Sequence, residues 1–235
     1  MLLCAITDRQ RLRSLTGTPA EREAACRRRL RGLLHGWAEG GVDLVQLREK
    51  DLDLAALLSL AGELLADLER GQLKILLNFP ASSLSVFFAE DRAGGLAALL
   101  PLCDGIHLPG KPVAEDVELV REAFRRHGRE CLVSMSCHSV EEIHTSRRAR
   151  ADLVFYAPVF EKYVPGGEEY APRRAQGLAA LERACAAAEG MPVFALGGVT
   201  VANAPDCLGA GAAGVAGIRL FEKDEWRKLG RRDHI

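Results

Sequence analysis

Two polar side chains sit in an otherwise apolar segment near residue 45. The stretch "DLVQLREKD" (residues 43–51) runs through apolar residues and then ends in four charged ones. Because side chains alternate along a strand, Gln46 and Arg48 share one face. Placing an arginine in a protein interior is costly unless it meets an anion. The segment therefore predicts a strand end where Arg48 has an anionic partner.

Further polar residues follow other apolar runs along the chain. They are Thr7-Asp8, Asn78, His107 and Ser136 to His138. Taken singly, Asn78 is typical of a turn residue, and His107 is typical of a hydrogen-bonded histidine in the core. His138 alone fits a structural role and a functional role equally well. Histidine has an unperturbed pKa near ~6.5, so His138 could accept and return a proton near neutral pH.

Two glycine-containing segments have the features of phosphate-binding loops. "ALGGVTVAN" contains Gly197 and Gly198, and "AGAAGVAGIRLF" contains Gly217 and Ile218. Glycine allows backbone N–H groups to approach a phosphate closely, and a helix start behind the loop favours the charge. Tight packing of helix on strand is the alternative explanation. We predict that the four residues bind phosphate.

The elements that would position these residues alternate between strand and helix. Short apolar runs predict strands at 2–7, 43–48, 74–78, 104–108, 131–136, 152–157, 192–196 and 213–218. Amphipathic patterns between them predict helices at 21–41, 54–71, 114–128, 139–150 and 174–190. Residues 79–101 fit two short helices or an irregular loop.

Eight such units predict an α/β fold, a (β/α)8 TIM barrel formed by a single domain over 1–235. A doubly wound open sheet remains the alternative, because periodicity does not distinguish it from a closed one. In a barrel, active sites gather at the C-terminal strand ends. Six of the eight predicted ends carry polar residues, a bias that a purely structural barrel would not need.

Composition narrows the classes of partner. The chain is 48% apolar and 27% charged with a net charge of −1, which gives no reason to expect nucleic acid or an anionic membrane. The seven cysteines form no CxxC pair and are odd in number, so we expect a reduced, cytoplasmic protein. We predict neither a signal peptide nor a membrane span.

Six segments together resemble the thiamine phosphate synthase and TenI family. They are "GVDLVQLREKDLD", "DGIHLPG", "SMSCHSVEE", "ADLVFYAPVFEK", "FALGGVTVAN" and "GAGAAGVAGI", in the family's order across roughly residues 2–221. The resemblance implies a TIM barrel of thiamine biosynthesis that binds a phosphorylated thiazole. In the synthase it also implies a site for hydroxymethylpyrimidine diphosphate and Mg²⁺.

The resemblance also suggests roles for individual residues. Gln46, Arg48 and Lys50 resemble the family's anion-binding strand end, where the anion is diphosphate in the synthase and a substrate carboxylate in the TenI branch. We expect Asn78 and Ser136 to bind substrate as well. Where the family often has a small or hydroxyl residue, this chain has Arg219, which either strengthens phosphate binding or faces solvent.

The chain departs from the synthase pattern at the magnesium ligands. The synthase usually has Asn-Asp after the third strand and Gly-Gln-x-Asp after the fourth, whereas this chain has Asn78-Phe79-Pro80 and a stretch that ends at Pro112. Mg²⁺ prefers carboxylate and phosphate oxygens. The synthase's Thr-Lys-rich diphosphate loop after the sixth strand is replaced here by "EKYVPGGEEY". In this segment Lys162 does not align with the family's lysine position.

The TenI branch resembles the chain more closely. It shares Leu-Pro after the fourth strand and the His-Ser-x-Glu-Glu motif at 138–142. The resemblance implies a tautomerase that aromatises thiazole carboxylate phosphate. His138 would remove a ring proton, and the imidazolium, Cys137 or water would return one to the exocyclic carbon.

Three functions are compatible with the sequence. We expect the tautomerase, with no metal and no cofactor, and the sequence leaves a homo-oligomeric state open. The first alternative is thiamine phosphate synthase, which would require Mg²⁺. The second is a non-catalytic ligand-binding or regulatory barrel, because one fold hosts many functions.

Overall fold

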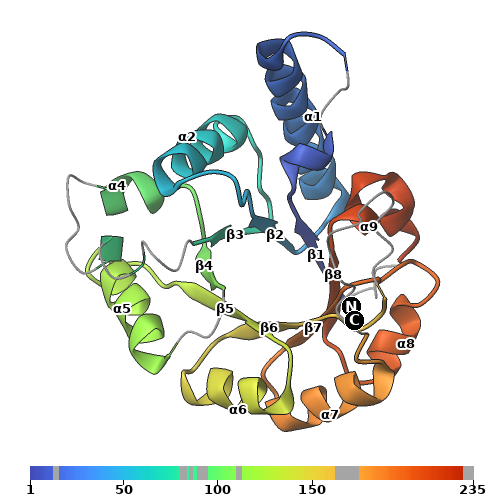
Figure 1. The fold of residues 1–235 in the computed structure, drawn as a ribbon. Helices are drawn as coiled ribbons and strands as arrows, with labels where there is room; N and C mark the ends of the chain where they lie inside the picture. The colour runs from blue at the N-terminus through green and yellow to red at the C-terminus, as the bar shows by residue number, and fades with distance from the viewer. Residues whose placement is uncertain are drawn as a thin grey trace.

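The computed structural model shows eight parallel strands closed into a barrel (Figure 1). It describes residues 1–12, 16–79, 84, 87–88, 95–109, 113–161 and 175–229. The strands are β1 (Leu2–Ile6), β2 (Leu44–Leu47), β3 (Lys74–Asn78), β4 (Gly105–Leu108), β5 (Leu132–Cys137), β6 (Leu153–Tyr156), β7 (Val193–Leu196) and β8 (Gly214–Gly217). Each pairs with its neighbours in sequence, and β1 also pairs with β8. The predicted (β/α)8 TIM barrel is confirmed.

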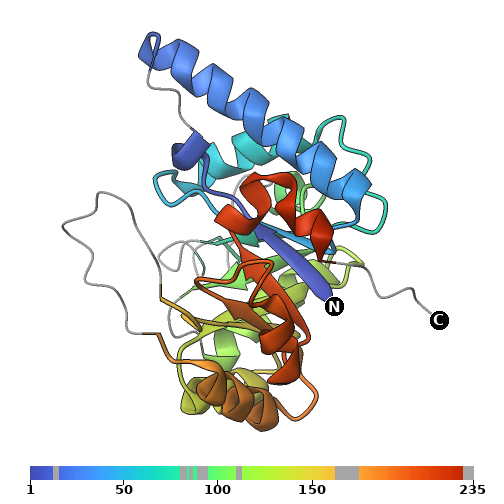
Figure 2. The ribbon, with the colours of Figure 1, turned by 90° about the vertical axis from the view of Figure 1, so that its right-hand side faces the viewer.

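Helices surround the barrel, as Figure 1 shows. They are α1 (Pro19–Gly40), α2 (Leu54–Leu65), α4 (Gly95–Leu99), α5 (Ala114–Arg125), α6 (Val140–Arg148), α7 (Leu178–Ala188), α8 (Ala204–Gly209) and α9 (Arg219–Glu222), with 3₁₀ turns η1 (Arg9–Leu12) and η3 (Asp224–Lys228). Figure 2 shows that α1 projects beyond the barrel, on the side opposite the N-terminus. Among the described helices, none combines the length and the apolar character that crossing a membrane requires.

The core has two parts, because each strand is buried on both faces. Outward-facing strand residues pack with the helices in one large cluster. Inside the barrel lies a smaller apolar cluster of Cys4, Ile6, Leu44, Leu76, Leu153, Phe155, Phe194 and Ala216. Buried parallel strands are continuous apolar runs for this reason, and all eight are recognisable in the sequence.

One helix prediction differs from the structure, and one predicted helix start is confirmed. The helix predicted over 54–71 ends at Leu65, because the chain turns from there, and Gly71 (φ 54°) lies in a separate turn. The predicted helix start at Ser139 is confirmed, since its hydroxyl accepts a hydrogen bond from the Glu142 N–H. The Glu142 carboxylate accepts from the His138 N–H, so α6 fixes the backbone at a predicted site residue. Within 79–101, α4 is described, and most of 80–94 lies outside the described residues.

Candidate active site

A band of polar side chains crosses the barrel interior near the C-terminal ends of β2 to β5. Gln46, which is buried, donates through Nε2 to Asn78 Oδ1 at 3.0 Å. On the next strand, His107 is paired in register with Asn78 and with Ser134. The other side of the interior is apolar, with Phe155 and Phe194 at a ring-centroid distance of 5.5 Å. A flat ring with one polar edge would suit this division.

His107 is a satisfied interior histidine. Its Nδ1 lies 2.9 Å from Ser134 Oγ and its Nε2 lies 2.9 Å from Ser136 Oγ. Its ring also meets Phe155 edge-on. Burial first, and then the nearby charge of Arg48, lower the pKa of His107 to about 3. His107 is therefore neutral at physiological pH, and the predicted substrate residue Ser136 is its hydrogen-bond partner.

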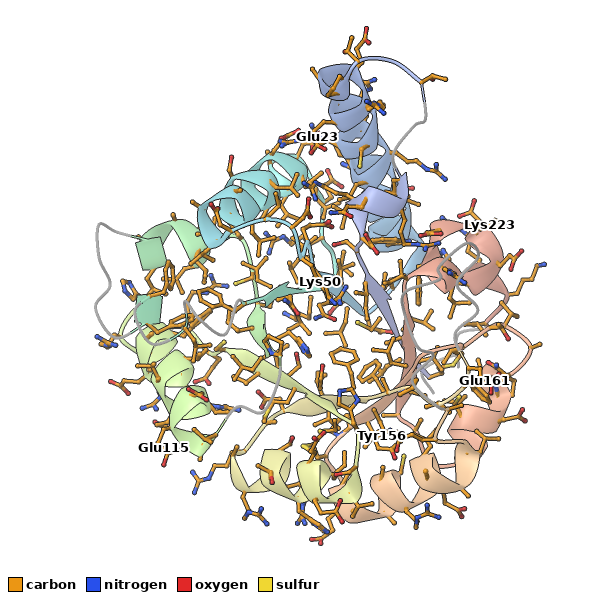
Figure 3. The ribbon with its side chains drawn as sticks, viewed as in Figure 1. Glu23, Lys50, Glu115, Tyr156, Glu161 and Lys223 are labelled. Atoms are coloured by element: carbon orange, nitrogen blue, oxygen red, sulfur yellow. The ribbon has the colours of Figure 1, made fainter. Side chains whose placement is uncertain are left out.

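Arg48 is a half-buried cation at the barrel mouth. Burial lowers the pKa of its guanidinium, against the opposing effect of Asp8 and Glu49. Among the residues that the structure describes, none forms an ion pair with its guanidinium. Asp8 and Glu49 thus act on Arg48 through their charge at a distance, without a direct ion pair among the described residues. Lys50, two residues further, is exposed and lies beside the end of β2 (Figure 3).

A network of buried ions outside the barrel holds the strand end that carries Arg48. Glu49 Oε1 accepts from the Thr7 hydroxyl at 2.6 Å, and the same hydroxyl accepts from the Arg48 N–H at 2.9 Å. Glu49 Oε2 accepts from the Arg9 N–H at 2.9 Å and lies 3.6 Å from the Arg9 guanidinium. Arg9 also pairs with Asp51 at 2.5 Å. The charged residues after β2 thus point in two directions: Arg48 faces the barrel mouth, whereas Glu49 and Asp51 bind Arg9 outside the barrel.

His138 lies just beyond β5 and contacts the residue that follows the neighbouring strand β6. Its Nδ1 is 2.5 Å from the carbonyl oxygen of Ala157, which also accepts from Gln176 Nε2 at 3.1 Å. A carbonyl can only accept, so Nδ1 carries the proton and Nε2 is the basic nitrogen of the neutral ring. His138 is exposed, so a substrate can reach it. Its position suits a general base or acid.

One predicted role is wrong. Cys137 is outside the barrel, where its Sγ lies 3.2 Å from Ser146 Oγ on α6. It is fully buried, and burial raises the pKa of its thiol to about 11. Cys137 therefore cannot return a proton to a ligand in the barrel mouth.

The glycine loop after β7 has the conformation that close approach of the backbone requires. Gly197 (φ 95°) and Gly198 (φ 67°) are both in the left-handed region. A Cβ on Gly198 would lie 2.6 Å from Glu161 O and 2.7 Å from Phe160 Cβ. No described residue accepts a hydrogen bond from the N–H of Gly198 or of Ile218. Gly217 ends β8, and Arg219 is exposed at the start of α9.

The position that would hold a magnesium ligand in the synthase is occupied by an aromatic cluster. Phe79 is fully buried and packs on Phe87 and Phe88 at centroid distances of 5.2 and 4.9 Å. Pro112 and Lys162 lie outside the described residues. Within the described part of the chain, His, Cys, Asp and Glu form no group of three that could hold a metal ion. Phe79 therefore supplies no oxygen ligand at the position where the synthase resemblance implies a magnesium carboxylate.

Several residues of the site are not predicted by the sequence. Thr7 and Asp8 are recognisable only as a polar strand end, Glu49 only as part of the charged end after the second strand, and Arg9 and Ser134 are not indicated by any motif. A signal for Ser134 exists, because it is two residues before Ser136 and so shares its face. The pairing of Arg9 with Glu49 has no local signal, since 40 residues separate them.

The closed eight-stranded barrel is a TIM barrel, and its polar strand ends form the candidate site at its C-terminal mouth. The model of the thiamine monophosphate synthase family (TMP-TENI) matches residues 18–221, and the chain belongs to this family. The family expected from the sequence is thus confirmed.

Relatives and solved structures agree with that assignment. A putative thiamine-phosphate synthase of Geobacter sulfurreducens is 35% identical over 87% of this chain and 84% of its own length. A putative thiamine-phosphate synthase 2 of Aquifex aeolicus is 30% identical over 77% of this chain and 83% of its own.

A thiamine phosphate pyrophosphorylase from Pyrococcus furiosus superposes with a TM-score of 0.62 at 20% identity, over 97% of this chain and 90% of its own, which supports the fold alone. The coarse prediction of a thiamine-biosynthesis enzyme is confirmed. The names of the relatives favour the synthase alternative over the tautomerase.

Proposed function

We propose that this enzyme binds a thiazole carboxylate phosphate across the barrel mouth and aromatises it by acid/base proton transfer. The phosphate would bind the N–H groups of the Gly197-Gly198 and Gly217-Ile218 loops. The carboxylate would lie toward Arg48, and the acidic ring carbon toward His138. His138 would remove the ring proton through Nε2 and return one to the exocyclic carbon, so that a single imidazole both accepts and donates.

The observation that carries this proposal is Phe79. A displacement of diphosphate develops charge that a metal ion normally neutralises, and the resemblance places a metal carboxylate at this position. A buried phenylalanine cannot bind Mg²⁺. Moving a proton between two carbons needs only a base and an acid, and one imidazole can serve as the base and then, once it has accepted the proton, as the acid.

The second candidate is thiamine phosphate synthase, and a specific observation favours it. The curated relatives carry that name, over most of their own length. In that case Arg48 would bind a diphosphate instead of a carboxylate. Mg²⁺ would then need ligands other than the family's, because Phe79 is not one.

The proposed reaction should not depend on divalent metal. We expect turnover of the thiazole carboxylate phosphate to be the same in EDTA as in millimolar Mg²⁺. The assay is the rate of aromatic product formation by the purified protein, with its metal content measured in parallel. Loss of turnover in EDTA that Mg²⁺ restores would favour the synthase alternative.

Binding should depend strongly on the phosphate. Each hydrogen bond to a charged group contributes about 1.5–3 kcal/mol, so loss of two should weaken binding on the order of 100-fold or more. We expect this ratio between the phosphorylated and the unphosphorylated thiazole in calorimetric titrations. The variant Gly198→Ala should reduce the ratio, because its Cβ would meet Glu161 O. Gly190→Ala is the matched control, with φ 92° but open space around a Cβ. Equal affinities for the two thiazoles would rule out the phosphate site.

Removing the Arg48 guanidinium should impair binding more than catalysis. We expect Arg48→Ala to raise KM roughly ten-fold or more, as the loss of a charge-assisted hydrogen bond does, with a smaller change in kcat. Arg48→Lys should recover part of the binding, since it keeps the charge and loses the two-pronged geometry. A large fall in kcat at unchanged KM would instead place Arg48 in the chemical step.

A further inference from the structure

Three side chains form a hydrogen-bonded chain from the barrel interior toward its mouth. Ser134 Oγ contacts His107 Nδ1, and His107 Nε2 contacts Ser136 Oγ, both at 2.9 Å. Ser134 is fully buried, whereas Ser136, two residues nearer the C-terminal end of β5, is half-buried. The arrangement connects a sealed hydroxyl to one that a ligand can reach.

The direction of these hydrogen bonds follows from counting donors. His107 is neutral, so one ring nitrogen donates and the other accepts. The Ser134 hydroxyl also has one proton to donate. Among the described residues, its only hydrogen-bond partner is His107 Nδ1. If Nδ1 carried the proton, the Ser134 hydroxyl would be a buried donor without an acceptor, which folded proteins rarely tolerate.

We infer that Ser134 and His107 fix Ser136 as a hydrogen-bond donor to the ligand. Ser134 donates to Nδ1, and Nε2–H donates to Ser136 Oγ. The Ser136 oxygen is then already an acceptor, and its own proton is directed to the ligand. Ser134 and His107 are positioning residues, and Ser136 is the group that touches substrate.

The neighbouring groups select the same kind of ligand atom. Asn78 accepts from Gln46 through Oδ1, which leaves its Nδ2 donors for other partners. Arg48 can only donate. Donors from β2, β3 and β5 therefore favour a group that only accepts, such as a deprotonated carboxylate. This identification of the ligand rests on the proposed function, whereas the proton positions do not.

The proton positions can be measured directly on the ligand-free protein. Nitrogen-15 NMR of histidine-labelled full-length protein distinguishes protonated from bare ring nitrogens. We expect His107 to show a protonated Nε2 and a bare Nδ1, unchanged between pH 5.5 and 8.5. The His107 signals are assigned as those that change position in the variant Ser134→Ala. If that variant does not fold, Ser134→Thr serves the same purpose. Ser146→Ala, a buried serine outside the barrel, should leave them unchanged. A protonated Nδ1 overturns the inference, whatever the protein catalyses.

The role of Ser136 is tested with two ligands that differ in one group. We expect Ser136→Ala to weaken binding of the thiazole carboxylate phosphate about ten-fold, as the loss of a hydrogen bond to a charged group does, and to leave the decarboxylated thiazole phosphate nearly unaffected. Equal weakening of both, or of neither, contradicts a donor to the carboxylate. If neither compound binds the wild-type protein, the proposed function fails, while the NMR result still decides the direction of the hydrogen bonds.

Discussion

The variant His138→Asn should lower kcat for the thiazole carboxylate phosphate by a factor of about 10²–10⁴, the usual contribution of a general acid/base. Asparagine can still donate a hydrogen bond to the Ala157 carbonyl, so the side chain can keep its orientation. It has no basic nitrogen where His138 has Nε2. KM should change little, because the phosphate loops and Arg48 are untouched.

Two features make this variant easy to interpret. His138 is exposed, and its contact with Glu142 is made through the backbone N–H, so folding should not depend on the imidazole. His144→Asn on the neighbouring helix α6 is the matched control and should keep wild-type kcat. Steady-state kinetics of the two variants side by side give the comparison. A wild-type rate in His138→Asn would remove this residue from the mechanism and strengthen the binding-protein alternative.

Replacing Arg9 should have the largest effect on stability. Arg9 is 4% exposed and is bound to Glu49, Asp51 and Glu23. Breaking a buried ion pair by removing one partner typically costs 3–5 kcal/mol, and we expect Arg9→Met to lower the free energy of unfolding by about that amount. Urea unfolding followed by circular dichroism measures the change. The double variant Arg9→Met with Glu49→Gln should recover part of the loss, because no buried charge is left behind.

The deficit of Arg9→Met should grow as pH rises. Burial raises the pKa of Glu49, and the hydrogen bonds from Thr7 and Arg9 oppose that rise. Without Arg9 the folded-state pKa of Glu49 rises further, so the variant loses stability as pH increases through that value. In the wild type, the hydrogen bond from Arg9 lowers the pKa of Asp51 to about 2. Asp51 therefore adds to the free energy of unfolding at pH values above its unfolded-state pKa, and this stabilisation is lost as pH falls toward 2. A deficit that is larger at pH 5 than at pH 8 would contradict this account.

The sequence predicted the barrel well because its strands are buried on both faces. Each of the eight strands is a short apolar run, and each was expected within about two residues of its observed bounds. Helix ends were less predictable where a turn continues the apolar pattern, as after Leu65 in α2.

The site was predictable where alternation along a strand decides the direction of a side chain. Gln46, Asn78 and Ser136 all point into the barrel, as that rule requires. The same rule places Cys137 outside, which excludes the proton-returning role expected for it. The bonds among Arg9, Thr7 and Glu49 join residues about 40 positions apart, and no local pattern encodes them.

One paired assay tests most directly whether this barrel moves a proton or joins two substrates. Purified protein is given the thiazole carboxylate phosphate tautomer in EDTA and, separately, thiazole phosphate with hydroxymethylpyrimidine diphosphate and Mg²⁺. Formation of the aromatic thiazole is followed in the first reaction and release of diphosphate in the second. We predict catalysed aromatisation in the first and no catalysed diphosphate release in the second. Diphosphate release with thiamine phosphate as product, and aromatisation no faster than without protein, would contradict the proposal.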